Sequence, residues 1–146
     1  MLPNRRCFER GSAMPFYAVV LTTILLPLMS LSIDIVSFFY ARTHLQAAVD
    51  AACEAAAQAL DTAHFVESGE ARILPGRAWS WAGREFHASL LGRQMGEYSP
   101  SLDRVALQSA TVVTCSASAQ VRRFIPFTPP MQAIVYSVSE MKVGRQ

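Results

Sequence analysis

An apolar segment without charged side chains dominates the first quarter of the chain. Between Gly11 and Ile33 the only ionisable side chain is that of Tyr17, and Leu, Val, Ile and Ala fill most other positions. About 20 apolar residues in a helix, each rising about 1.5 Å, cross a hydrocarbon layer of about 30 Å. The pattern predicts a transmembrane helix over residues 12–33, which Pro15 and Pro27 should bend or locally unwind.

A cleaved secretory signal is the competing interpretation of this segment. The apolar core of such a signal spans about 7–15 residues and ends at a small-x-small cleavage site. Here the run is longer, and beyond Asp34 it continues to Tyr40 without a turn signal. A retained anchor is therefore favoured. Asp34 ends the run, so we expect it at the membrane interface rather than as a functional charge inside the bilayer.

Helical periodicity continues beyond the membrane segment, through a stretch rich in alanine, the strongest helix former. It predicts one helix from about Ala13 to Phe65, with residues 34–65 as its exported continuation. A stripe at 3-4-3 spacing holds small and apolar side chains: Leu45, Val49, Ala52, Cys53, Ala56, Leu60 and Ala63. Close packing is expected at Leu45, Ala48, Val49, Ala52 and Ala56, against either the protein's own domain or a neighbouring helix.

The remaining residues, 66–146, predict a small α+β domain. Residues 66–77 resemble a linker, and Tyr98-Ser99-Pro100 should end a second helix over residues 78–95. The apolar stripe of that helix is Trp79, Ala82 (or Gly83), Phe86 and Leu90. We expect Trp79 in the core, with a place on the membrane surface as the alternative.

Alternation of apolar and polar residues predicts three antiparallel strands. It is strict from Val113 to Val121, and weaker over residues 104–109 and 133–143. The expected fold class is α+β: a long N-terminal transmembrane helix continuing into an exported amphipathic helix, a second short helix, and a small antiparallel sheet of about three strands.

Charge sets the expected orientation. Arg5, Arg6 and Arg10 precede the apolar segment and only Glu9 opposes them, so residues 1–11 form a basic tail. The positive-inside rule places this tail in the cytoplasm and the C-terminal domain outside, on a single-pass membrane protein. These four side chains carry the whole net charge of +2. The exported part is therefore neutral, which argues against nucleic acid as a partner.

Two of the three cysteines lie on the exported side. Cys7 belongs to the cytoplasmic tail, whereas Cys53 and Cys115 enter a compartment where disulfides persist. They predict either a bridge between helix and sheet or two small buried thiols. His44, Cys53 and His64 cannot form a metal site, because Cys53 and His64 are about 16 Å apart along one helix. No nucleotide loop, catalytic triad or paired acidic site is present, so neither an enzyme nor a cofactor or small-molecule substrate is expected.

Three short motifs occur in register along the first part of the chain. Arg10-Gly11-Ser12-Ala13 precedes the apolar helix, and Asp34 closes it, followed by Phe39-Tyr40-Ala41-Arg42. Leu45-Gln46-Ala47-Ala48-Val49-Asp50-Ala51-Ala52 comes next. This arrangement resembles the TadE/TadG-like proteins of Tad (Flp) pilus assembly, whose stretch LQNAADAAA differs by Ala47 and Val49. The family motif residues carried over are Asp34, Arg42, Gln46 and Asp50.

The resemblance implies a pilin-like fold and a minor pilin-like component, in the bacterial inner (cytoplasmic) membrane, of a pilus machine related to type IV pili. Its partners would be the bilayer and other pilins or pilus-assembly membrane proteins, and it would reach a surface filament only if it leaves the membrane. A prepilin-type peptidase would cut between Gly11 and Ser12. TadE-like proteins carry Glu at mature position five, where this chain has Phe16. Longer TadG proteins often carry a metal-binding Asp-x-Ser-x-Ser that is absent here. Cleavage and subtype therefore stay open.

Two functions follow from the sequence. The first is an assembly role through helix–helix packing and protein contacts. The second is a signal-anchored exported module that binds an envelope partner and never enters a pilus.

Overall fold

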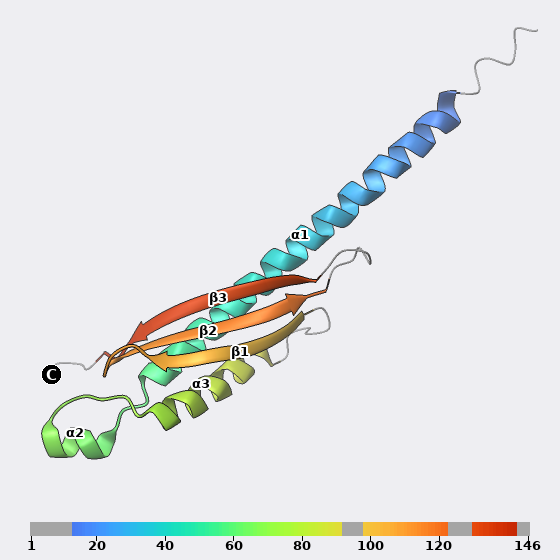
Figure 1. Ribbon diagram of the computed structural model, residues 1–146. Helices are drawn as coiled ribbons and strands as arrows, with labels where there is room; N and C mark the ends of the chain where they lie inside the picture. Colours follow the sequence, from blue (N-terminus) through green and yellow to red (C-terminus); the bar gives the residue numbers. More distant parts are fainter. Residues whose placement is uncertain (1–12, 92–97, 123–129, 143–146) are drawn as a thin grey trace, which may run out of the picture.

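A computed structural model describes residues 13–91, 98–122 and 130–142 of the chain (Figure 1). The elements are α1 (Ala13–Ala57), α2 (Thr62–Ser68), α3 (Pro75–Leu90), β1 (Tyr98–Leu107), β2 (Val112–Val121) and β3 (Met131–Glu140). The three strands form one antiparallel sheet in the order β1-β2-β3. The α+β fold class predicted from the sequence is confirmed.

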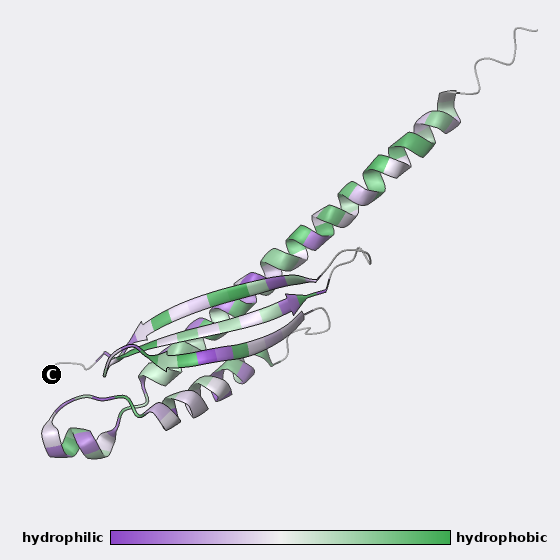
Figure 2. Cartoon of the chain, viewed as in Figure 1, coloured by the Kyte–Doolittle hydropathy of each residue, from purple (hydrophilic) through white to green (hydrophobic). Residues whose placement is uncertain are grey.

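The first helix is a rod that extends far beyond the rest of the fold. Its 45 residues span about 67 Å. Pro27 lies inside it, but the helix is uninterrupted, so the predicted local unwinding is wrong. Pro15 falls near the helix start, where a missing backbone N–H costs little. Figure 2 shows that the free N-terminal half is mainly hydrophobic, whereas polar residues appear where α1 meets the sheet.

The predicted end of this helix at Phe65 is wrong, because tertiary pairing overrides local helix propensity. After Ala57 the backbone turns and pairs with a later segment: Leu60 and Ile73 form an antiparallel bridge. The Asp61 N–H donates to the Arg72 carbonyl at 2.8 Å, and the Leu74 N–H donates to the Ala59 carbonyl at 2.9 Å.

A short helix, α2, occupies part of the segment expected to be a linker. The Asp61 carboxylate accepts from the His64 N–H at its first turn. Gly69 ends it with φ of 74°, a left-handed conformation that glycine adopts without steric cost.

The third helix starts earlier than predicted and exposes a different tryptophan face. Pro75 begins it, as proline does at a first helical position. The buried stripe is Ala78, Ala82, Phe86 and Leu90. Trp79 is 50% exposed, so its expected place in the core is wrong; the small Ala78 fits there instead.

The strands are longer than predicted at the start of the sheet. Tyr98, expected to end a helix, begins β1 and pairs with Val121. Pro100 is tolerated because β1 is an edge strand and can spare a backbone donor. The predicted alternation in β2 is confirmed. β3 begins at Met131, two residues before its predicted start, and Val143 lies outside the described residues.

One face of the sheet carries both long helices. The C-terminal half of α1 packs under β2 and β3, and α3 lies beside it, against α1 and β1 (Figure 1). The buried core lies between these two layers, with Phe86 and Leu45 among its largest fully buried side chains.

Candidate functional site

The N-terminal half of α1 exposes an apolar surface on all sides. It is the one helix among the described residues that is long and apolar enough to cross a membrane. Only 6% of its most apolar 18-residue stretch is buried. The hydroxyl groups of Thr22, Thr23 and Ser32 donate to carbonyls of the preceding turn of the same helix. These three hydroxyl groups therefore find partners inside the helix, as a lipid environment requires.

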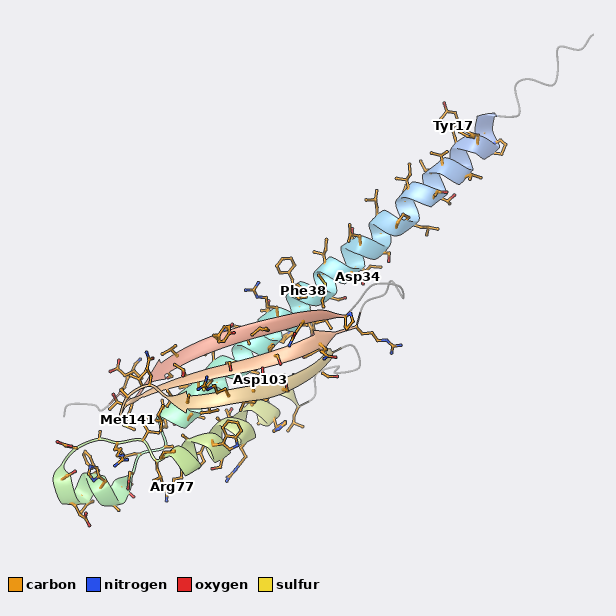
Figure 3. The ribbon with its side chains drawn as sticks, in the orientation of Figure 1. Tyr17, Asp34, Phe38, Arg77, Asp103 and Met141 are labelled. Atoms are coloured by element: carbon orange, nitrogen blue, oxygen red, sulfur yellow. The ribbon has the colours of Figure 1, made fainter. Side chains whose placement is uncertain are left out.

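Asp34 marks the boundary between the free part of α1 and the domain (Figure 3). Nearly all described residues before it are exposed, whereas Ala41 and Leu45 after it are buried in the core. Asp34 itself is 9% exposed and has an interaction partner. This acidic side chain thus lies where the apolar segment meets the rim of the folded domain.

The five side chains predicted to pack closely are all buried in the protein's own core. These are Leu45, Ala48, Val49, Ala52 and Ala56. The sequence left open whether this face is covered by the protein's own domain or by a neighbouring helix. In the structure, the protein's own domain covers it. The stripe does not continue beyond Ala57, and Ala63 on α2 is exposed. A neighbouring protein therefore cannot use this face without unfolding the domain.

Three of the family motif residues, Arg42, Gln46 and Asp50, lie on the polar flank of α1, whereas the fourth, Asp34, is buried. The Gln46 amide donates to the Asp50 carboxylate at 2.9 Å and to the Tyr136 carbonyl at 3.1 Å. It ties α1 to the free edge of β3, a connection that sequence spacing did not indicate. Arg42 and Asp50 are exposed. Gly11 and Ser12, the expected cleavage position, lie outside the described residues.

Cys53 on α1 and Cys115 on β2 are both buried, free thiols. Their side chains form a hydrogen bond, which lowers the pKa of Cys53 and raises the pKa of Cys115, while burial acts to raise both. The Cys53 thiol also lies 3.5 Å from the Val113 carbonyl. The disulfide expected from the sequence stays a prediction.

Sequence reasoning missed an open groove at the far end of the domain. It lies between the last turns of α1 and the end of β3, with a volume of about 710 Å³. Its lining is Glu54, Ala57, Gln58, Leu60, Val138, Ser139, Glu140, Met141 and Lys142. The groove depends on the pairing of distant segments, so no local pattern could have revealed it. Within the described residues, no group of three or more His, Cys, Asp or Glu side chains could hold a metal ion.

Comparison with known proteins places the first third of the chain in context. No curated protein and no solved structure matches the chain. Residues 11–59, which comprise α1 and the residues before and after it, match the family model of Flp pilus-assembly TadE/G-like proteins (Tad), so the resemblance expected from the sequence is confirmed over that segment.

Proposed function

We propose that this chain is a membrane-anchored, minor pilin-like component of a Tad/Flp-type pilus-assembly machine. The single observation that carries the proposal is the continuity of α1. One uninterrupted helix begins as an exposed apolar rod, passes Asp34 and ends as the central core helix of a domain. The segment matched by the pilus-assembly family covers this helix.

The proposed topology follows from the same helix and the charge at its start. Residues 12–33 span the inner membrane, the basic residues before them stay in the cytoplasm, and the domain lies outside. Exposing this apolar rod to water is unfavourable. Its transfer into lipid is favourable by about 25 cal/mol for each Å² of apolar surface removed from water.

Burial of the alanine face changes the proposed mode of action. Helix–helix contacts with other pilins or pilus-assembly membrane proteins are left to the membrane half of α1. The domain makes its contacts through its outer surfaces, and the protein acts without catalysis or a cofactor.

The test is deletion of the gene in the host, with complementation by the full chain. We expect loss of assembled pili and recovery on complementation. Fractionation with protease treatment of spheroplasts should find the protein in the inner membrane, with its domain accessible from outside. Normal piliation in the deletion strain, with the same membrane topology, would instead support an exported binding module outside the pilus.

The N-terminal sequence of the native protein separates two versions of this role. A start at Ser12 would show peptidase processing at Gly11 and support entry into a filament. A start at Met1 would support a permanent anchor that serves the machine from the membrane.

A further inference from the structure

Two complementary surfaces lie on opposite flanks of the domain. The first, here called the α3 stripe, consists of Arg77, Trp81 and Arg84. Their spacing of four and three residues puts them on one helix face, opposite the buried stripe of α3. All three are exposed, Trp81 by 37%. Tryptophan and arginine are the side chains most enriched at the centres of protein interfaces.

The second surface is the groove at the free edge of β3. Glu54 and Glu140 are acidic members of its lining, Lys142 is the base there, and Asp50 lies one turn before Glu54 on the same side of α1. Val138, 64% exposed, adds apolar surface beside Met141 and Leu60. The groove therefore combines apolar side chains with two acidic groups and one lysine, and the net negative charge complements two arginines flanking a tryptophan.

The charges of the two surfaces do not pair with one another or with other charges among the described residues. Within residues 13–91, 98–122 and 130–142, no ion pair involves Arg77, Arg84, Glu54 or Glu140. The two surfaces also cannot meet within one copy. α3 packs at the β1 side of the sheet, whereas the groove lies at the β3 side, and β1 and β3 are opposite edges.

The α3 stripe and the groove overlap in their height along α1. The Leu74 N–H donates to the Ala59 carbonyl, so the start of α3 is level with the end of α1. From there α3 runs back antiparallel to α1 (Figure 1). At 1.5 Å per residue, Arg77 is about 4.5 Å and Arg84 about 15 Å back along the axis, roughly level with Ala56 and Val49.

That range includes Glu54, the acidic side chain that α1 contributes to the groove, and Asp50, which lies one turn before it. Figure 3 shows Arg77 and Met141 at the same end of the domain, remote from Tyr17 at the start of α1. Two copies anchored in one bilayer stand at equal height, so the α3 stripe of one copy would face the groove of the next without either helix shifting along the membrane normal.

We propose that copies of this chain associate side by side in the membrane, with the α3 stripe of one copy seated in the β3-edge groove of the next. The proposal rests on the membrane anchoring proposed above. The contact is heterologous, because the two copies use different surfaces, and it extends into a ring or a row rather than stopping at a dimer.

The test uses the full chain in bacterial membranes, with the photo-crosslinking residue p-benzoylphenylalanine in place of Trp81. We expect crosslinked dimers and higher species, with the crosslinked peptide containing groove residues such as Val138 or Met141. The same residue in place of Val66, which is 83% exposed on α2, is the matched control and should give few crosslinks. Crosslinks from position 81 that map to a different envelope protein and not to a second copy would overturn the proposal.

Charge reversal gives a second readout. Arg77→Glu with Arg84→Glu, or Glu54→Arg with Glu140→Arg, places like charges opposite each other and should lower crosslinking about tenfold or more. Mixing the two variants restores opposite charges at every contact, so crosslinking should return. A mixture as weak as either variant alone, while both keep the thermal transition of the natural protein, would overturn the proposal.

This experiment is independent of piliation. If self-association fails but the protein is found in the membrane and its deletion abolishes pili, the proposed function stands and this interface is wrong. If the protein is absent from the membrane fraction, it is the proposed function that fails.

Discussion

Cys53 and Cys115 contact each other across the interface between α1 and β2. Both are buried, and the Cys53 sulfur also lies 3.6 Å from the carbonyl of Ser137, the cross-strand partner of Cys115. Two residues far apart in sequence thus place their thiols together at one point where the helix crosses the sheet.

We predict that this pair becomes a disulfide when the domain lies outside the cytoplasm. The two thiols give two electrons and two protons to an external disulfide, which acts as the oxidant and is reduced to a dithiol. The bridge closes a long loop and should stabilise the domain by about 2–4 kcal/mol. The protein is isolated from host membranes, unfolded and alkylated. Mass spectrometry should then find Cys53 and Cys115 labelled only if the protein was reduced first. Labelling of both without reductant would contradict the prediction.

The buried alanine face predicts a large effect of added volume. Ala52 lies on the face of α1 that packs into the core, and it is fully buried. Ala52→Leu should lower the free energy of unfolding by about 1–3 kcal/mol, because a packed core must shift to accept the extra atoms. Denaturation of the full chain in detergent, followed by circular dichroism, measures this. Ala47→Leu on the exposed face of the same helix is the matched control and should change stability by about 0.5 kcal/mol or less. Equal effects at the two positions would contradict the packing described here.

The family motif residue Gln46 has a structural role that can be measured. Its amide bonds the Asp50 carboxylate and the Tyr136 carbonyl, so Gln46→Ala should cost about 1 kcal/mol. Hydrogen exchange in β3 near Tyr136 should also become faster. Gln58→Ala is the comparison, because within the described residues the Gln58 side chain has no hydrogen bond. Unchanged exchange in β3 would show that Gln46 does not hold this strand.

The largest fully buried side chain should dominate the stability of the contact between α1 and α3. Phe86→Ala removes it from a site with no exposure and should cost about 3–5 kcal/mol. Tyr136→Ala removes a ring that is mostly exposed, and should cost about 1 kcal/mol or less, within the range of strand propensity. Thermal unfolding of the two variants gives the comparison, and a smaller loss for Phe86→Ala than for Tyr136→Ala would contradict the burial described here.

Local patterns were sufficient to predict the long helix through Ala57, the buried alanine stripe, the strict alternation in β2 and the family resemblance. These features depend on periods of 3.6 and 2 residues, on alanine content and on short motifs, all of which act over a few residues of chain. The fold class followed because a helix with one small-residue face and strands with one apolar face must cover each other.

Other features depended on contacts between distant segments. Local composition favours helix through Phe65, but the backbone pairing of residues 59–61 with residues 72–74 ends α1 at Ala57. The sequence placed Trp79 at the start of the buried face of α3, but the packing of α3 turns the neighbouring Ala78 inward and leaves Trp79 half exposed. The choice between the protein's own sheet and a neighbouring helix as partner of the alanine face was open for the same reason. Periodicity shows that a face is buried, whereas the identity of the covering surface is set by how the whole chain folds back on itself.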